Sequence, residues 1–461
     1  MRRGKAIGWT LVLGLVAWAL VGRGLVNYDT LYALVWGRDL THGRLPDYDV
    51  SLAPTPHPLA TVAGAALSVL GPRAAIAATI VLAFVFLGAV GWITYRLGEA
   101  WINRAAGVLA AAIVLTRRPV LDFGARAYVD VPYLALVLGA LLVETRRRRA
   151  GAPVLALLGV AGLIRPEAWL FSGAYLVWLW IGGVRDPRLL ALAAAAPLLW
   201  ALGDLAVTGD PLHSLVGTRE TAQRLQRITG LTEVPRTVPR RLGEIVREPV
   251  LFGAAGGGLL ALAFLRERVA LGAAAGVIAL AAFCVLAAAG LPILGRYLLV
   301  PAAIVALFCG AGAFGWAELP QGHPWRRRWA WFGALTLVGL VAFIPAQVGR
   351  IGDLRDALRI QDAIQDDLHT LIPRLRCTPV TVPNHRPVPL LALWLDVEPR
   401  RVAVAQERRP RGGTYVVPSS AHVARQYILD PRDVDPRIPP PPAGFRLVGA
   451  NASWRAFARC R

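Results

Sequence analysis

Long apolar runs recur along the first three quarters of the chain, and short polar or basic stretches separate them. Runs of this length match the ~30 Å hydrocarbon core of a bilayer, where a helix satisfies its own backbone hydrogen bonds. We therefore predict an α-helical polytopic membrane protein with about eleven transmembrane helices. The predicted helices cover residues 7–26, 73–95, 104–117, 129–144, 151–164, 168–183, 189–207, 249–265, 269–290, 297–316 and 330–347.

Basic residues mark the inner ends of these helices. Clusters of arginine at 146–149 and 326–328 lie in the short polar stretches between apolar runs. This is the pattern of cytoplasmic loops. The first run resembles a signal peptide, but it is long and lacks a small-residue cleavage site, so we expect it to be retained. With the N-terminus inside, two large outer loops follow at 27–72 and 208–248. The stretch "HPLATVAGAALSVLGP" at 57–72 is short for a span and is expected to lie along the membrane surface or dip into it.

The pattern changes after residue 347. Residues 353–372 have helical period, and "CTPVTV", "RRVAVA", "TYVVPS" and "FRLVGA" are short strand-like runs. We therefore predict a membrane domain at 1–347 and a small extracytoplasmic α/β domain at 348–461. Cys377 and Cys460 bracket this region and can pair outside the cytoplasm, although sequence alone does not prove the pairing.

Composition supports the membrane class and excludes one alternative. The chain is 56% hydrophobic, with a mean hydropathy of +0.50, which is rare for a soluble protein of this size. The formal net charge of +21 would suggest nucleic acid in a soluble protein, but here the basic residues lie in tails between apolar runs. We expect the lipid bilayer, and no nucleic acid, among the partners of this chain.

Ionisable residues at the outer ends of the helices are candidate functional groups, because burying a charge in a membrane is costly. Carboxylates can deprotonate a hydroxyl or hold a cation, and arginine can hold a phosphate through paired hydrogen bonds. Such a set suits transfer from a phosphate-bearing lipid to a hydroxyl acceptor. Its members are Asp29, Asp47, Asp49, His57, Asp122, Arg126, Asp130, Arg165, Glu167, Asp210, His213 and Arg296.

Asp29 is the leading catalytic candidate. It follows the first apolar run, where "NYDTLYALVW" has the pattern of a short amphipathic helix. The alternative is that Asp29 only caps this helix; the two roles are compatible.

Asp47, Asp49 and His57 lie in the same outer loop. Asp47 and Asp49 could bind a divalent cation as a D-x-D pair, but turn formation after Pro46 is the simpler interpretation. His57 is either a solvated loop residue or a contact for phosphate or acceptor.

Three isolated arginines lie on the outer side of separate helices. Arg126 is spaced i, i+4, i+8 with Asp122 and Asp130, so these residues form either a salt-bridge ladder on one helix face or a substrate contact held by two acids. Arg165, with Glu167, and Arg296, beside Tyr297, lie at outer junctions. For these the alternative is snorkelling to the interface.

Several of these motifs, in this order, resemble the GT-C superfamily of membrane glycosyltransferases. That superfamily includes the protein O-mannosyltransferases and the bacterial aminoarabinose-to-lipid A transferases. The resembling segments are "NYDTLYALVWGRDLTHGRLP", "PTPHPL", "TGDPLHSLVGTRE" and "GRYLLVP", together with the outer C-terminal domain. Two positions differ from the family pattern: its acidic pair is here Asp29-Thr30, and its basic residue before "PPL" is here His57.

The resemblance implies inverting transfer of a single hexosyl or pentosyl group from a polyprenyl-phosphate donor to a hydroxyl of an envelope glycan, lipid or protein. Asp29 would be the general base, and no second acid is needed because phosphate is a good leaving group. Arg126, Arg165 or Arg296 would stabilise the charge that grows on the donor phosphate. Apart from the resemblance, His57 and Tyr297 are further candidates for contact with phosphate or substrate. The candidate acids, which could be linked to a metal, are Asp49, Asp122, Asp130 and Glu167.

Two further points stay open at this stage. No cofactor is certain, and a divalent metal ion is one option. A transporter or flippase of a lipid-linked anion would also explain the helices and the arginines, but it predicts inverted repeats and charges deep within spans, and a structural scaffold would tolerate the loss of Asp29. The implied location is the bacterial cytoplasmic membrane.

Overall fold

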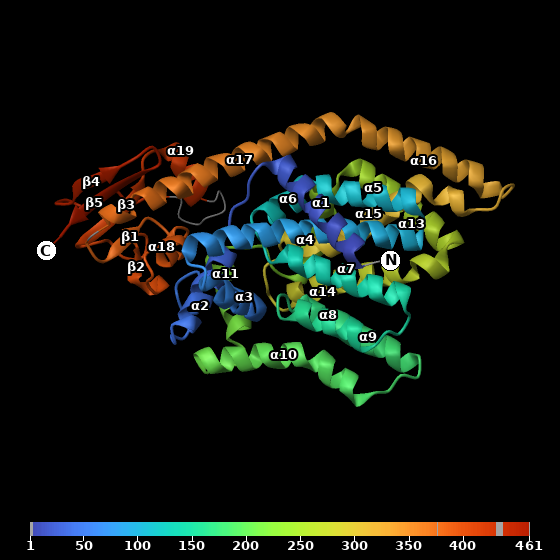
Figure 1. Cartoon of the computed structure of the whole chain (residues 1–461), viewed down its shortest axis with the longest axis horizontal. Coiled ribbons are helices and arrows are strands. Elements are labelled where there is room, and N and C mark those ends of the chain that lie inside the picture. Colours follow the sequence, from blue (N-terminus) through green and yellow to red (C-terminus); the bar gives the residue numbers. More distant parts are fainter. Residues whose placement is uncertain (1–2, 376, 430–436, 461) are drawn as a thin grey trace. The chain divides into compact units, whose positions relative to one another are not determined.

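The computed structural model describes residues 3–375, 377–429 and 437–460 (Figure 1). Each of the eleven apolar runs predicted above forms a helix, which confirms the helical membrane class. These helices are α1 (Arg3–Val21), α4 (Pro72–Trp101), α5 (Arg104–Thr116), α7 (Asp130–Arg146), α8 (Ala152–Gly162), α9 (Glu167–Ile181), α10 (Pro187–Thr208), α13 (Glu248–Phe264), α14 (Arg266–Ala288), α15 (Leu299–Phe314) and α16 (Pro324–Ala342).

The helices differ in their ability to cross a membrane. Within the described ranges, α1, α4, α10, α14 and the α15 region are long and apolar enough to do so alone. Three further pairs qualify only together, because each is bent at a break: α6 (Arg118–Ala125) with α7 by 113°, α12 (Val234–Val246) with α13 by 108°, and α16 with α17 (Ile344–Thr370) by 41°. The helices α3 (Pro58–Ser68), α5 and α8 are apolar but shorter.

The chain forms two compact units. The first, called here the bundle unit, contains Met1–Gly22, Val81–Leu202 and Ile228–Leu354. The second, called the loop unit, contains Arg23–Ile80, Gly203–Arg227 and Arg355–Arg461. The loop unit thus combines most of the predicted first outer loop, the start of the second and nearly all of the C-terminal region. The second outer loop is not irregular, since it folds into α11 (His213–Arg224) and α12.

Small residues let helices of the bundle unit approach closely. α15 packs against α5 and α13 (Figure 1). A side chain at Gly257 of α13 would collide with the backbone of Gly312 in α15, so glycine is required at this crossing. Close packing of small residues is a main source of helix association in membranes, where lipid removes much of the hydrophobic driving force.

The loop unit holds a pair of short helices from the first outer loop. α2 (Tyr28–Thr41) and α3 cross closely, and a Cβ atom at Gly64 would strike the backbone carbonyl of Ala33. α2 is buried along most of its length, from Thr30 to Asp39. It is therefore a core helix of the loop unit, with Asp29 in its first turn.

A five-stranded mixed sheet forms the C-terminal part of the loop unit. Its order is β2-β1-β3-β5-β4, with β1 parallel to β2 and β3, and β5 antiparallel to β3 and β4. The four strand-like runs contain β1 (Val380–Val382), β2 (Val402–Val404), β3 (Gly413–Pro418) and β4 (Arg446–Ala450), whereas β5 (Trp454–Arg459) was not predicted. Cys377 and Cys460 form a disulfide next to this sheet.

The remaining elements of the chain are short. They comprise α18 (Val388–Trp394), α19 (Ala421–Val423), a π-helical turn (Ala424–Ile428) and 3-10 turns at Leu231–Glu233, Gly295–Leu298, Gly315–Glu318, Ile372–Arg374 and Pro399–Arg401.

One hydrophobic core joins the first outer loop to the C-terminal region. Leu31, Leu34 and Val35 of α2 belong to the same buried cluster as Leu391 of α18 and Trp454 of β5. Segments that share a core lie on one side of a membrane. The stretches that leave this unit and return to it must therefore cross an even number of times, and the predicted topology satisfies this condition.

A buried arginine fastens α2 to the C-terminal region. Arg38 is 4% exposed and donates to the backbone carbonyls of Ala392 and Val397 at 2.7 Å, and to the Asp39 carboxylate at 2.8 Å. Arg44 also donates to Asp39, at 2.9 Å. These bonds satisfy a charge that would otherwise be expensive to bury.

Replacing Arg38→Met should lower the free energy of unfolding of the loop unit by about 3 kcal/mol, because the Asp39 carboxylate and two carbonyls lose their main donor. The exposed Arg400 offers a matched control, and Arg400→Met should change stability by less than about 1 kcal/mol. Pulse proteolysis in urea, read through a C-terminal tag, measures both variants. An equal effect of the two substitutions would contradict this role of Arg38.

The disulfide between Cys377 and Cys460 predicts how many cysteines a thiol reagent can label. A maleimide reagent should label two cysteines per chain, Cys284 and Cys309, in denatured but unreduced protein, and four after reduction. The Cys377→Ser variant should expose a third thiol, that of Cys460, before reduction. Labelling of all four in the unreduced parent would show that the bond is absent.

Candidate active site

Asp29 occupies the first turn of α2, but it does not cap the helix. The N-cap is Asn27, whose side-chain oxygen accepts from the backbone N–H groups of Asp29 at 2.8 Å and Thr30 at 3.1 Å. The capping role proposed for Asp29 is therefore wrong, because Asn27 already satisfies these two donors. The Asp29 carboxylate is partly buried and stands at the positive end of the helix dipole.

A row of aromatic rings leads from this helix to a polar pocket. Tyr28, Tyr32 and Trp36 share one face of α2, with centroids 5.0 Å apart at each step. Trp36 contacts Tyr48 at 4.8 Å, and Tyr48 stacks on His213 at 6.0 Å. The row therefore couples the position of α2, and with it Asp29, to the wall of the pocket.

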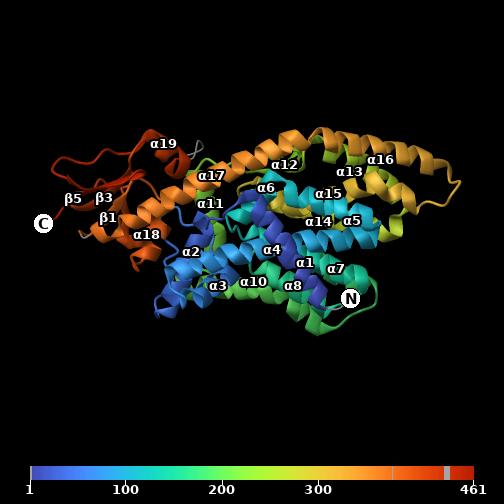
Figure 2. The same ribbon diagram turned by 45° about the horizontal axis from the view of Figure 1, so that its top comes forward.

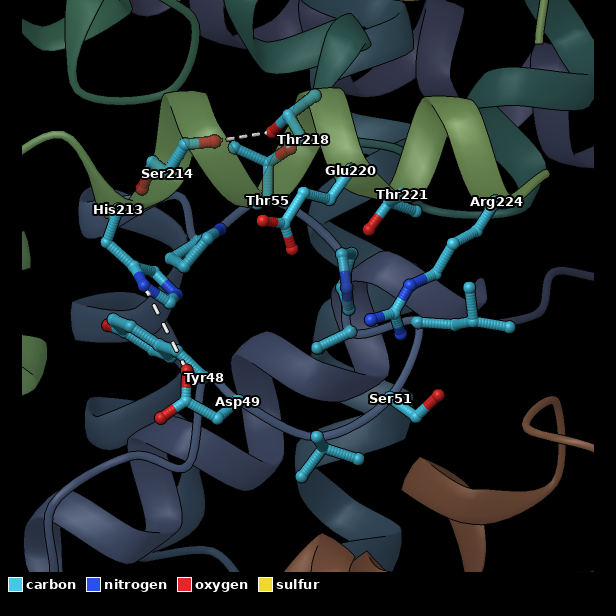
Figure 3. Close-up of a pocket in the computed structure, with 16 residues that line it drawn as sticks. Tyr48, Asp49, Ser51, Thr55, His213, Ser214, Thr218, Glu220, Thr221 and Arg224 are labelled. Carbon is cyan, nitrogen blue, oxygen red and sulfur yellow. Dashed lines mark hydrogen bonds and ion pairs between the residues drawn. The ribbon is translucent and has the colours of Figure 1, made fainter. Parts of the chain in front are cut away.

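The pocket is a cavity of about 120 Å³ within the loop unit, between residues 48–56 and α11 (Figure 3). Its space suffices for roughly four water molecules. The side chains of Glu220 and Arg224 extend from α11 into the opening, and Ser51 lies across from them (Figure 3). The other polar side chains at its wall are those of Tyr48, Asp49, Thr55, His213, Ser214, Thr218 and Thr221.

Hydrogen bonds hold both walls of this pocket in place. The buried Asp204 carboxylate accepts from the Ser214 backbone N–H at 2.9 Å and from its hydroxyl at 2.8 Å, which fixes the start of α11. Thr55 and Thr218 join the two walls through a 2.6 Å hydroxyl contact. The Tyr28 hydroxyl donates to the Leu52 carbonyl at 3.0 Å, so the residue before Asp29 also supports the loop.

The pocket offers neutral donors, the Arg224 guanidinium and negative acceptors. Burial, and then the Asp204 carboxylate, raise the pKa of the Tyr48 phenol to about 12, so it keeps its proton at any physiological pH. Asp49 is exposed and lies 4.0 Å from the His213 ring. Asp47 faces Arg400 at 3.7 Å, and partial burial raises its pKa despite that cation. Such a lining suits a ligand rich in hydroxyl groups.

A second cluster, in the bundle unit, brings together four predicted residues around Arg165. Its guanidinium pairs with Asp130 at 2.6 Å and Glu167 at 3.6 Å, and its centre lies 4.5 Å from the Tyr297 ring centroid. Asp130 is 1% exposed and Arg165 4%. Burial opposes the charge of Arg165, but the carboxylates of Asp130 and Glu167 outweigh it and raise the pKa of the guanidinium above its usual value.

Arg296 completes this cluster. Its Nε lies 3.9 Å from the second oxygen of Asp130, and its guanidinium contacts the rings of Tyr128 at 5.2 Å and Tyr297 at 5.8 Å. Arg296 keeps about a fifth of its side chain exposed, whereas Arg165 is enclosed by its partners. Arg296 is therefore the arginine of this cluster that can reach a ligand.

The predicted salt-bridge ladder of Asp122, Arg126 and Asp130 is correct for its first pair and wrong for its second. Arg126 pairs with Asp122 at 2.6 Å. The helix, however, ends at Ala125, and Ala127 takes a left-handed φ of 51°. The chain bends by 113° before Asp130, which therefore points to Arg165 instead of Arg126.

Neither the acids near the pocket nor those of the Arg165 cluster form a metal site within the described residues. In the ranges that the structure describes, no three His, Cys, Asp or Glu side chains are placed to hold an ion together. Asp130 and Glu167 lie close to each other, but the Arg165 guanidinium already occupies the position of a cation between them. His57 is buried at the N-terminus of α3, where its side chain makes no capping bond. No cofactor is established for this chain.

Sequence reasoning missed Asp204, Glu220 and Arg224. A signal existed for Asp204, because it is an acid near the end of a long apolar run. Glu220 and Arg224 are spaced i, i+4 in "TRETAQR" and share one face of α11, but only folding places that face against residues 48–56.

The fold was compared with known proteins. No family model and no curated sequence matches the chain. Among solved structures, the chain is similar to ArnT from Cupriavidus metallidurans bound to undecaprenyl phosphate, with a TM-score of 0.59 and 12% identity over 99% of this chain and 98% of ArnT. The chain therefore shares the fold of ArnT over nearly its whole length.

A second similarity is weaker. The oligosaccharyltransferase of Archaeoglobus fulgidus tethered with an acceptor peptide matches with a TM-score of 0.49 and 13% identity, over 88% of this chain and 64% of that one. The same enzyme in complex with Zn and sulfate matches with a TM-score of 0.48 and 13% identity, over 90% and 68%. The fold assignment therefore rests on ArnT.

The buried Arg165 cluster predicts energetic coupling. Asp130→Asn and Arg165→Gln should each lower the free energy of unfolding by roughly 3–5 kcal/mol, because each leaves a buried charge without its partner. The double variant should lose less than the sum, with a coupling of about 0.5–3 kcal/mol. The more exposed Arg126 provides the control, and Arg126→Gln should cost less than about 1 kcal/mol. Strict additivity in thermal unfolding would contradict the pair.

Proposed function

We propose that this chain is an inverting glycosyltransferase that moves one hexosyl or pentosyl group from a polyprenyl-phosphate donor to a hydroxyl acceptor. The acceptor is a glycan, lipid or protein of the cell envelope. The observation that carries the proposal is the shared fold with ArnT over nearly the whole of both chains, because that protein was solved with undecaprenyl phosphate bound. Asp29 at the start of α2 supplies the base that such a reaction needs.

The reaction balances with one base. Asp29 takes the proton from the acceptor hydroxyl while the acceptor oxygen attacks the anomeric carbon of the sugar. The bond from that carbon to the phosphate oxygen breaks with inversion, and the polyprenyl phosphate leaves as an anion. A separate acid is not needed, because the phosphate leaves without being protonated, unlike the sugar oxygen in glycoside hydrolysis.

The other candidate residues take supporting roles in this proposal. Arg296, held beside Tyr297, would stabilise the charge that develops on the leaving phosphate. Arg165, Asp130 and Glu167 would position Arg296 and Tyr297 through the buried cluster. Arg126, Asp122 and His57 remain proposed contacts for substrate, without a more detailed role.

The polar pocket would receive the acceptor. Its hydroxyl and carboxylate side chains suit an acceptor that is itself hydroxylated. It lies in the same unit as Asp29, and Tyr28 links its wall to the helix turn that carries the proposed base. Asp49 would accept hydrogen bonds from the acceptor there. No step is assigned to a metal, because the described side chains provide no ligand set for one.

The proposed topology follows from the basic clusters and from the shared core. The N-terminus lies in the cytoplasm of a bacterial cell, and the loop unit, with the C-terminal region, lies on the outer face of the cytoplasmic membrane. This placement puts Asp29 and the pocket at the surface where lipid-linked sugars and envelope acceptors meet.

Asp29→Asn should reduce kcat for sugar transfer by about a hundred- to ten-thousandfold, the usual contribution of a general base. The purified parent and variant are reconstituted and supplied with a panel of radiolabelled polyprenyl-phosphate sugars and crude envelope glycan. The exposed Asp353 of α17 gives the control variant, Asp353→Asn, which should transfer at the parental rate.

Two results would count against this mechanism. Equal transfer by the parent and by Asp29→Asn would remove Asp29 from the chemistry. Movement of an intact labelled lipid across the vesicle membrane, without transfer from any donor, would instead identify the chain as a transporter.

A further inference from the structure

A group of three arginines in the bundle unit has too little negative charge to balance it. Arg117 follows α5, Arg247 lies at the turn between α12 and α13, and Arg350 lies on α17. Arg117 is only 8% exposed, yet within the described ranges it pairs with no carboxylate. The ion pair that the described residues show in this group joins Arg247 to Glu248, which is largely exposed and lies 3.4 Å away.

Contacts of neighbouring residues place these three positions near one another. Arg117 donates to the Gln347 side chain at 3.1 Å, and Gln347 donates to the backbone carbonyl of Thr116 at 2.6 Å. Arg350 follows Gln347 by three residues and so lies on the same side of α17. Arg117 and Val246 line one small cavity, and Arg247 is the next residue. Both Arg247 and Arg350 repel the Arg117 guanidinium.

Donor groups in this cluster are left unused. The Nε atom of Arg117 is buried without a hydrogen-bond partner, and that of Arg247 makes no hydrogen bond beyond its 3.4 Å ion pair with Glu248. Arg247 also adopts a left-handed φ of 71°, a conformation that side-chain-bearing residues rarely take. Buried donors and buried like charges are both unfavourable alone. Both become favourable when an anion with several acceptor oxygens lies between them.

The surroundings indicate that such an anion carries an apolar chain. Apart from Arg117, the wall of the small cavity is aliphatic, with Val114, Val120 and Leu299 among its residues. Helices α16 and α17 follow one another along the chain (Figure 2). An exposed apolar stripe runs along α16 and the start of α17 and ends two residues before Arg350. Its side chains are Trp331, Leu335, Val338, Val341, Ile344 and Val348.

We propose that Arg117, Arg247 and Arg350 bind the phosphate group of a membrane lipid whose apolar chain follows this stripe. The Arg165 cluster is a contrast, because its two carboxylates already balance two arginines. Binding requires no transfer reaction, so this inference is tested apart from the proposed function. Two sources share the chemistry: a polyprenyl phosphate and an anionic phospholipid of the bilayer.

The test uses the full chain in detergent and two substitutions, Arg117→Gln and Arg350→Gln. The probes are a polyprenyl phosphate, phosphatidylglycerol and inorganic phosphate, and affinity is followed by microscale thermophoresis. Each substitution should weaken lipid binding about ten- to a hundredfold, the effect of losing a charge-assisted contact. The matched control is Arg118→Gln, the exposed neighbour of Arg117, which should bind like the parent.

A stability measurement separates this role from a structural one. Without lipid, Arg350→Gln should melt at or above the temperature of the parent, because it removes repulsion and breaks no side-chain ion pair or hydrogen bond with the residues that the structure describes. Added lipid should raise the melting temperature of the parent and of Arg118→Gln, but that of Arg117→Gln or Arg350→Gln much less.

The outcomes also separate the sources of the phosphate. Tighter binding of the polyprenyl phosphate would assign the site to the sugar carrier, and tighter binding of phosphatidylglycerol would assign it to the bilayer; both support the proposal. Equal binding of inorganic phosphate would overturn the lipid part, and unchanged lipid affinity in both variants would overturn the site. Loss of sugar transfer in Asp29→Asn with normal lipid binding would leave this site intact.

Discussion

The hydrogen bonds of Arg38 are the contact on which the loop unit depends. This buried side chain joins α2 to two carbonyls of the C-terminal region, and the shared hydrophobic core surrounds it. Segments more than 350 positions apart in the chain thereby become one unit. The place of α2 in turn sets Asp29, the row of aromatic rings and one wall of the polar pocket. The segment that carries Asp29 is thus held by the C-terminal region.

Charge neutralisation distinguishes the arginine groups of the bundle unit. Around Arg165, two carboxylates and two arginines balance, so the cluster can be buried as a rigid support. Around Arg117, a side chain of similar burial has an amide for a partner and two further arginines as neighbours. In the first case, carboxylates of the chain itself compensate the buried positive charge. In the second case, the proposed lipid phosphate would compensate it.

The two candidate regions divide the chemistry of the proposed reaction. The loop unit holds an acid at a helix start and a pocket of hydroxyls and carboxylates, which suit an acceptor. The bundle unit holds the arginines and exposes apolar helix faces, which suit a lipid phosphate. A reaction between a lipid-linked donor and a hydroxylated acceptor needs both environments, and the two kinds of surface come from different sequence segments.

The sequence by itself determined the membrane class, all eleven apolar helices and four of the five strands, because hydrophobic runs and local period are properties of short segments. It also pointed to Asp130, Arg165, Glu167 and Arg296 as charges at helix ends. Only the tertiary structure decided which charges meet. The bend after Ala125 redirected Asp130 from Arg126 to Arg165, Asn27 took the capping role of Asp29, and α11 brought Glu220 and Arg224 to residues 48–56. Such pairings depend on long-range packing and on one turn with an unusual φ, and neither leaves a pattern in the local sequence.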